Sequence, residues 1–236
     1  MTPYHNMSYI LQIETATTVC SVALAKDGEL MATKQVDQRN IHAEVITLYI
    51  EELITSAGIK YSDLDAIAIS SGPGSYTGLR IGVSTAKGLC YALDKPLIAI
   101  ETLQSMANGV IANNNVTTNT LLCPMIDARR MEVYTALFDS AGNKVKDTAA
   151  EIIDADSFSE QLKTNKILFF GDGAEKCREV LGGHPNAQFL TGFINSAEHL
   201  TSKSFEKFTS KVFEDVAYFE PYYLKEFLVT TSKKQA

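Results

Sequence analysis

Basic residues are too few in this chain for a protein that binds nucleic acid by charge alone. The 236 residues include 21 Lys+Arg against 28 Asp+Glu, which gives a formal net charge of −7. Residues 1–118 carry 7 basic and 11 acidic side chains, and residues 119–236 carry 14 and 17, so the excess of acid is even. Because neutralising phosphates needs the opposite sign, neither half is a basic module.

Cysteines and long apolar runs are also scarce. The cysteines stand far apart, at 20, 90, 123 and 177, with no C-x-x-C pair, which favours reduced thiols over disulfides or a zinc knuckle. No apolar stretch approaches the roughly 20 residues of a membrane helix. Residues 1–8 lack the cationic and apolar regions of a secretory signal. We therefore expect a cytoplasmic protein that makes no membrane contact.

Complete catalytic motifs are missing as well. The chain has no H-E-x-x-H, no G-x-S-x-G and no P-loop lysine followed by Ser or Thr. His42 has no second histidine four residues on, so we interpret it as a helix-start or surface histidine. Glu14, at the end of the first predicted strand, has two interpretations: it reaches a metal or a bound water, or it is a buried acid with local partners.

What the sequence does contain is a mixture of predicted strands and helices in two blocks. The first block alternates strands at 9–13, 20–25, 30–36, 66–70 and 97–100 with helices at 41–57 and 79–93. The second has strands at 121–126, 133–138 and 166–170, a short helix capped by Ser157 and a longer one at 196–214. The Asn- and Thr-rich stretch 108–120 is the expected linker. This order predicts an α/β protein with two similar halves.

The loop 71–80 is the most informative stretch. It places Gly72, Gly74 and Gly78 between a buried strand and a helix, an arrangement in which backbone N–H groups can cradle an anion. Glycines also let two backbones approach closely. Both interpretations stay open at this point.

The two predicted helices of the first block carry more apolar surface than one core needs. On 41–57 the polar side chains form only a narrow stripe, and 79–93 has an apolar row beside a row of small residues. This pattern predicts one face against the sheet and another against a partner protein; the alternative is cover from other parts of the same chain.

Two loops of the second block indicate a function less specifically than the glycine loop does. Asp127 with Arg129 or Arg130 predicts an ion pair that stabilises a turn. The segment 171–173, Gly-Asp-Gly, either approaches a nucleotide or serves a strand-to-helix turn.

Taken together, these motifs resemble the TsaB family of bacterial proteins of tRNA threonylcarbamoyladenosine synthesis, formerly described as glycoprotease-like. The run Gly72-Pro-Gly-Ser-Tyr-Thr-Gly-Leu-Arg80 is highly specific to it. Further matches lie at 10–15, 20–24, 42–44, 127–134, 171–173 and 221–224. The resemblance implies two actin-like domains of the sugar-kinase and heat-shock ATPase type, each a five-stranded mixed sheet flanked by helices. The expected bounds are 1–104 and 105–215, with 216–236 packing back on the first domain.

The resemblance also implies a role without catalysis. A TsaB protein pairs with TsaD, which transfers the threonylcarbamoyl group to adenosine in tRNA, and the small ATPase TsaE joins them. We expect the chain to form a homodimer when it is alone and to bind tRNA only through the complex. We expect no catalytic or metal-binding residue, because His42 stands alone where TsaD has two histidines four residues apart. No cofactor is expected for the chain by itself, and ATP or ADP at the junction with a partner stays open. The alternatives are an ATP-dependent enzyme of the actin-like kinase type and, least favoured, a metalloprotease.

Two sets of residues carry these expectations. The expected partner interface comprises Ile41, Val45, Leu48, Tyr49, Glu52, Ile81, Thr85, Gly88 and Ala92. The glycine loop with its expected nucleotide-proximal neighbours comprises Glu14, Thr15, Gly72, Pro73, Gly74, Ser75, Tyr76, Thr77, Gly78 and Arg80.

Overall fold

The first sheet has five strands in the order β3-β2-β1-β4-β5. The computed structural model describes residues 7–114 and 116–225. In this sheet β1 pairs antiparallel with β2 and parallel with β4, so the sheet is mixed. The strands are β1 (Tyr9–Glu14), β2 (Val19–Lys26), β3 (Glu29–Asp37), β4 (Leu64–Ser70) and β5 (Leu97–Ile100).

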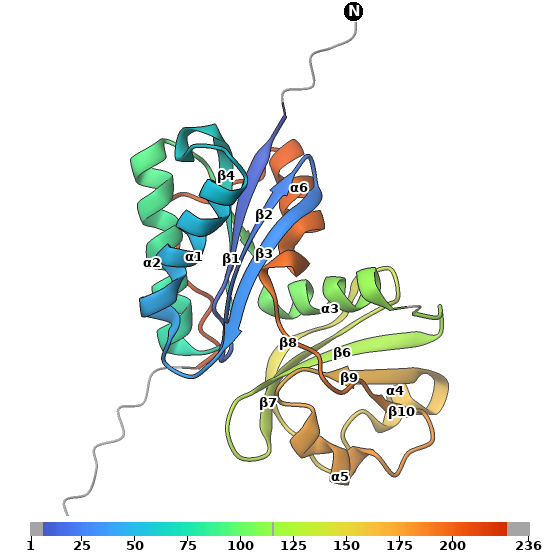
Figure 1. Cartoon of the computed structure of the whole chain (residues 1–236). Helices are drawn as coiled ribbons and strands as arrows, with labels where there is room; N and C mark the ends of the chain where they lie inside the picture. Colours follow the sequence, from blue (N-terminus) through green and yellow to red (C-terminus); the bar gives the residue numbers. More distant parts are fainter. Residues whose placement is uncertain (1–6, 115, 226–236) are drawn as a thin grey trace, which may run out of the picture.

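Helices cover both faces of this sheet. Figure 1 shows α1 (His42–Ser56) and α2 (Tyr76–Leu93) on one side of it and α6 (Thr201–Thr209) on the other. Each layer has its own apolar cluster, and the short helix η3 (Ala197–Leu200) joins α6 in the second one. Strands covered on both faces need apolar side chains on both, which is why β1, β2 and β4 are almost entirely buried.

The second sheet repeats the first, in the order β10-β9-β6-β7-β8. Its central strand is again antiparallel to the next strand in the chain and parallel to the one after the crossover. The chain therefore consists of two similar five-stranded mixed sheets with flanking helices, as the family resemblance implied. The elements are α3 (Thr102–Asn113), β6 (Thr120–Asp127), β7 (Glu132–Phe138), β8 (Lys144–Ile152), α4 (Ser159–Thr164), β9 (Lys166–Phe170), α5 (Arg178–Leu181) and β10 (Ala187–Phe189).

The first part of the expected linker is a helix. Residues 108–113 belong to α3, whose Leu103, Met106 and Val110 are buried against the second sheet. This burial outweighs the weak helix propensity of the asparagines. The sequence also missed β8 and β10.

The chain crosses between the sheets more often than the expected bounds of 105 and 215 suggest. Helix α3 packs on the second sheet from residue 102, and residues 197–209 return to the first sheet, where Ala197, Leu200 and Phe205 join its apolar cluster. The long helix expected at 196–214 is thus η3 followed by the shorter α6.

Helix starts differ from their expected positions by a few residues. Helix α2 begins at Tyr76 rather than 79, because the Ser75 hydroxyl accepts a hydrogen bond from the N–H of Gly78 at 3.3 Å. The short helix α4 follows Phe158, not Ser157; the Ser157 hydroxyl donates to Asp154 in the preceding turn instead.

The segment after α6 runs back along the first domain. Glu214 pairs with Leu97 at the end of the sheet, and the N–H of Tyr222 donates to the carbonyl of Ser71 at 2.7 Å. Lys87 on α2 donates to the carbonyls of Ala217 and Phe219. Residues 226–236 of the segment expected to pack back lie outside the described residues.

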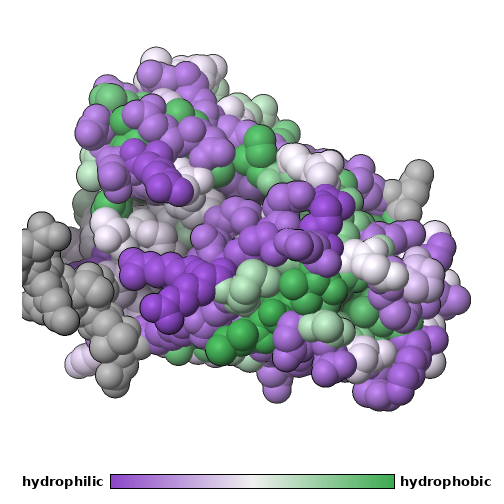
Figure 2. Space-filling view, turned by 90° about the horizontal axis from the view of Figure 1, so that it is seen from below, coloured by the Kyte–Doolittle hydropathy of each residue, from purple (hydrophilic) through white to green (hydrophobic). Residues whose placement is uncertain are grey.

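Hydrophilic side chains dominate the face seen in Figure 2, where a patch of apolar side chains interrupts them. Within residues 7–114 and 116–225, no helix has the length and apolar content to cross a membrane.

Candidate functional site

The turn between β1 and β2 holds a buried carboxyl group. Glu14 is fully buried, and its Oε1 accepts hydrogen bonds from the N–H of Ala16 at 2.7 Å and the hydroxyl of Ser70 at 2.8 Å. Burial raises the pKa of Glu14 to about 7, while these hydrogen bonds and the nearby Asn195 lower it in part. The site thus favours a neutral carboxyl over an ionised one.

The other oxygen of this carboxyl has no hydrogen bond. Among the described residues, Oε2 of Glu14 has no hydrogen-bond partner, and neither do the buried Oδ1 and Nδ2 of Asn195. Asn195 is near enough to affect the pKa of Glu14. Buried polar atoms without partners are rare in folded proteins. Glu14 is therefore a buried acid with local partners on one oxygen, which is the second of the two interpretations.

The glycine loop packs directly on this turn. A Cβ on Gly74 would lie 2.4 Å from the carbonyl oxygen of Ala16, and a Cβ on Gly78 would lie 2.1 Å from that of Thr15. The N–H of Ser75 donates to the Ala16 carbonyl at 2.7 Å. These glycines serve the close approach of two backbone segments, so the space beside them is filled by the chain itself.

A C-terminal strap, residues 221–225, covers the other side of the loop. Gly72 has a φ of +110°, and a Cβ there would lie 2.6 Å from the carbonyl oxygen of Tyr222. The rings of Tyr76 and Tyr223 are 4.9 Å apart, and Arg80 lies over the Tyr76 ring at 5.4 Å. Sequence reasoning placed 221–224 in the family pattern but did not show that it contacts the glycine loop.

His42 is a helix-start residue, but it is buried rather than on the surface. Its Nε2 donates to the carbonyl of Thr17 at 3.0 Å, which ties the start of α1 to the β1–β2 turn. In the described part of the chain, no three His, Cys, Asp or Glu side chains form a group that could hold a metal ion.

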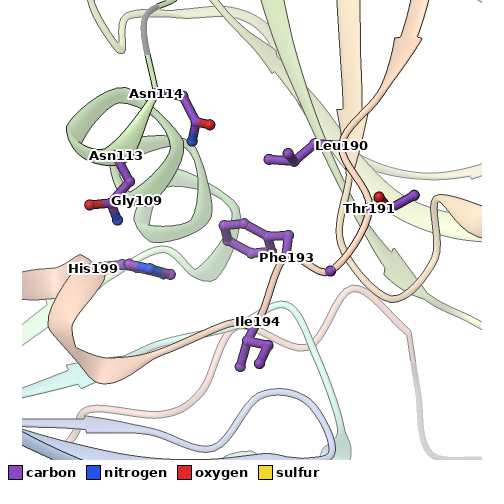
Figure 3. A pocket seen from close by; sticks show the side chains of 9 residues that line it. Gly109, Asn113, Asn114, Leu190, Thr191, Phe193, Ile194 and His199 are labelled. Atoms are coloured by element: carbon purple, nitrogen blue, oxygen red, sulfur yellow. The ribbon is translucent and has the colours of Figure 1, made fainter.

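Two hollows lie where the sheets meet. The larger, about 240 Å³, is lined by α3 and the segment 190–194, and the Phe193 and His199 rings stack at 5.3 Å (Figure 3). Burial lowers the pKa of His199 to about 4. The smaller, about 60 Å³, lies between Thr17 and Asp37 of the first domain and Asp172 and Asn195.

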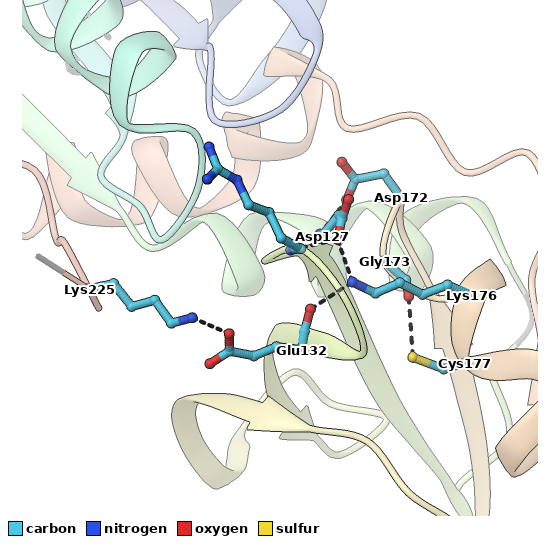
Figure 4. Close-up of polar contacts among 8 residues, drawn as sticks. Asp127, Glu132, Asp172, Gly173, Lys176, Cys177 and Lys225 are labelled. Carbon is cyan, nitrogen blue, oxygen red and sulfur yellow. Dashed lines mark hydrogen bonds and ion pairs between the residues drawn. The ribbon is translucent and has the colours of Figure 1, made fainter. Parts of the chain in front are cut away.

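The hairpin between β6 and β7 forms the opposite wall of this junction. Lys176 pairs with Asp127 and donates to the carbonyl of Glu132 at 2.7 Å, and Lys225 pairs with Glu132 (Figure 4). The ion pair predicted for Asp127 thus forms with Lys176, not with Arg129 or Arg130. Partial burial works to raise the pKa of Asp127, but hydrogen bonds from Lys176 and the Arg129 N–H, with the charges of Lys176 and Arg39, hold it below its usual value.

The segment 171–173 serves a close turn here. A Cβ on Gly171 would lie 2.3 Å from the Met125 carbonyl oxygen, and a Cβ on Gly173 would lie 2.9 Å from the carbonyl carbon of Ile126. As in the first domain, glycine allows a strand end to touch the neighbouring strand.

The expected interface residues lie on the outer side of α1 and α2, where two large apolar side chains are exposed. Leu48 is 53% exposed, and Tyr91, which the sequence did not single out, is 88% exposed. Gly88 and Ala92 are exposed on the same helix as Tyr91, so a second helix could approach α2 closely. The other expected residues lie on the same helices: Ile41, Val45, Tyr49, Ile81 and Thr85 are half-buried, and Glu52 is exposed and pairs with Lys34.

Comparison with known protein families shows one consistent match. A family profile described as "TsaD: tRNA N6-adenosine threonylcarbamoyltransferase" matches residues 35–229. The TsaB protein of Bacillus subtilis is 30% identical over 196 residues, which cover 80% of this chain and 80% of that protein. The TsaB protein of Escherichia coli is 38% identical over 136 residues, 58% of this chain; that alignment spans about half of the relative, 57% of its length.

Solved structures agree with these matches. The structure named YeaZ from Pseudomonas aeruginosa has a TM-score of 0.77 at 25% identity and covers 92% of this chain and 100% of that one. The activator of 2-hydroxyisocaproyl-CoA dehydratase from Clostridium difficile, solved with ADPNP, has a TM-score of 0.50 at 9% identity, over 87% of this chain and 96% of that one. The second likeness shows the shared actin-like fold only.

Proposed function

This chain belongs to the TsaB family, and from that premise we propose that it is a non-catalytic subunit of tRNA threonylcarbamoyladenosine synthesis. It pairs with a TsaD protein, which carries out threonylcarbamoyl transfer to adenosine in tRNA, and TsaE joins the pair. The TsaD profile over most of the chain and the TsaB name of its relatives support this proposal. The four free, buried cysteines support a cytoplasmic place of action.

The observation that carries the proposal is the apolar face of α1 and α2, which residues 7–114 and 116–225 leave exposed. Leu48 and Tyr91 expose apolar side chains next to Gly88 and Ala92, and the half-buried Val45 continues the face. Apolar cores with aromatic residues and small neighbours are typical of protein interfaces. We propose that TsaD occupies this face, and that a second copy of the chain occupies it when the chain is alone.

Replacement of Gly88 by arginine tests this. A Cβ at Gly88 meets no other described atom within 4 Å, so the variant should fold normally while a charged side chain enters the interface. Gly88→Arg should abolish co-elution with TsaD on size exclusion. Gly183→Arg is the matched control, because Gly183 is equally open but lies in the second domain. Undiminished pairing of Gly88→Arg, with both variants folded by circular dichroism, would exclude this face.

The second candidate is an ATP-dependent enzyme of the actin-like kinase type. Oε2 of Glu14, which has no partner among the described residues, favours it, since a carboxyl that loses its proton to bind Mg²⁺ supplies an oxygen ligand of the kind that this ion prefers. The glycines of the loop disfavour it, because Gly74 and Gly78 pack against the carbonyl oxygens of residues 15 and 16 rather than facing an open space. Calorimetry with ATP and Mg²⁺ on the chain alone separates the two: we expect no turnover, and tight binding with turnover would establish the enzyme. If the chain alone shows no turnover, any nucleotide would lie at the junction with TsaD.

A further inference from the structure

Three arginines gather at the edge where the two domains meet. Arg39 comes from the loop between β3 and α1, and its charge acts on Asp127 of the opposite domain. Arg129 and Arg130 form the tip of the β6–β7 hairpin that begins at Asp127, and both are exposed. Among the described residues, none of the three guanidinium groups makes a hydrogen bond or an ion pair, although Arg39 and Arg129 exert their charges on neighbours.

The other two of the chain's five arginines are engaged. Arg178 makes two hydrogen bonds to the carboxylate of Glu175, both at 2.9 Å, and Arg80 packs on Tyr76. The arginines without partners are thus confined to one edge. An arginine fork of planar donors is well suited to phosphate oxygens.

The backbone at the hairpin tip is strained at Arg129 and Arg130. Arg129 has a φ of +74° and Arg130 a φ of +49°, in the left-handed region that glycine, asparagine and aspartate adopt far more readily than arginine. The turn is held from below: the N–H of Arg129 donates to Asp127 at 2.9 Å, and the N–H of Glu132 donates to the Arg129 carbonyl at 3.1 Å. Bulky arginines kept at strained positions on a rigid turn indicate that their side chains act outside the hairpin.

Lysines already neutralise the nearest acids. Lys176 pairs with Asp127 and Lys225 pairs with Glu132, so the arginines are not needed for those carboxylates. Asp37 and Asp172 line the small hollow at this edge. The guanidinium groups of Arg39, Arg129 and Arg130 therefore present positive charge there that no described ion pair takes up.

We propose that Arg39, Arg129 and Arg130 form a contact for the phosphodiester backbone of RNA. This rests on the proposed function in tRNA modification, and it assigns part of the RNA contact to this subunit. A free nucleotide fits less well, because the adjoining hollow measures about 60 Å³ while small-molecule sites occupy about 300 Å³ or more. Backbone phosphates need only exposed, rigidly presented cations.

The test is the salt dependence of tRNA binding by the full chain. We expect fluorescence anisotropy with an unmodified tRNA transcript at 20–200 mM KCl to show weak binding, with a Kd of about 10⁻⁴–10⁻⁶ M at the upper end of this range. The double variant Arg129→Gln/Arg130→Gln should bind at least about a hundredfold more weakly than the wild type at 20 mM KCl. Its slope of log K against log salt should fall by about 2, and the Arg39 triple variant's by about 3.

Controls separate the arginines from folding and from general charge. Arg178→Gln should leave affinity and slope unchanged, and the double lysine variant of Arg129 and Arg130 should keep most of the slope. Arg129→Asn/Arg130→Gly should melt at a higher temperature than the wild type, because the turn is relieved, yet lose binding like the glutamine variant. A variant that melts at a higher temperature and yet binds tRNA more weakly cannot have lost binding through misfolding.

Three results would overturn the proposal: no tRNA binding by the wild type at 20 mM KCl, equal losses for Arg178→Gln, or displacement of the tRNA by micromolar inorganic triphosphate. Co-elution with TsaD is measured on the same variants and should stay unchanged. A failed pairing with intact tRNA binding would contradict the proposed function but not this contact.

Discussion

Replacement of Glu14 by glutamine should change how the stability of the protein depends on pH. The carboxyl is fully buried, and its pKa is raised from 4.5 to about 7 by burial. A carboxyl whose pKa is higher in the folded state stabilises the fold when protonated. Its contribution is therefore present below pH 4.5, is lost as the pH rises from 4.5 to about 7, and stays constant above that.

The magnitude follows from the same values. The difference between 4.5 and about 7 corresponds to about 3 kcal/mol at 1.4 kcal/mol per tenfold change in an equilibrium constant. Glutamine is neutral at every pH, and its Oε1 can still accept from Ala16 and Ser70. Its amide can donate to the unpartnered Oδ1 of Asn195. The variant should be about as stable as the wild type near pH 4.5 and more stable by up to about 3 kcal/mol above pH 7.

Urea unfolding at pH 4.5, 6, 7 and 8 measures this difference. Other titrating groups are common to both proteins, so they cancel when the two free energies of unfolding are subtracted. Glu44→Gln removes an exposed carboxylate from α1 and serves as the control. A difference between Glu14→Gln and the wild type that stays flat from pH 4.5 to 8 would refute the account of this buried carboxyl.

Three further predictions concern the same elements. Gly82→Ala should destabilise the fold by about 1–3 kcal/mol, because its Cβ would lie 2.2 Å from Oγ1 of Thr15, whereas Gly88→Ala in the same helix should stabilise it by about 0.5–1 kcal/mol; urea unfolding of both decides. Tyr223→Ala removes a ring contact worth about 0.5–1.5 kcal/mol and should speed limited proteolysis within the strap, and an unchanged rate would contradict its role in holding the strap. His42→Ala leaves a buried carbonyl without its donor and should cost about 1–3 kcal/mol in thermal unfolding, so an unaltered melting curve would argue against this tie.

The sequence predicted the fold correctly where a strand or helix has a clear local pattern of buried apolar residues. The strands at 66–70 and 97–100 are fully buried and were predicted to within two residues. Helix α3 was missed because its asparagines and threonine neighbours suggest a loop, and only its burial against the second sheet makes it a helix. The return of residues 197–209 to the first sheet is a long-range contact that no local pattern contains.

The candidate site also has a part that the sequence predicted and a part that it did not. The sequence pointed to the glycine loop, but two functions of glycine remained open, and only the distances from Gly74 and Gly78 to residues 15 and 16 favour backbone packing. Asn195 carried no signal, since its importance comes from the unpartnered Glu14 beside it. The positive φ of Arg129 and Arg130 carried no signal in the sequence, because it depends on how the connection 128–131 joins the two strands.

The central claim is that the α1 and α2 face docks TsaD, and hydrogen exchange tests it most directly. Amide exchange of the full chain should be recorded with and without an excess of TsaD. The account predicts added protection in His42–Ser56 and Tyr76–Leu93, concentrated around Leu48, Gly88 and Tyr91, and little change in the second sheet. Protection confined to the second sheet, with both helices unchanged, would contradict it.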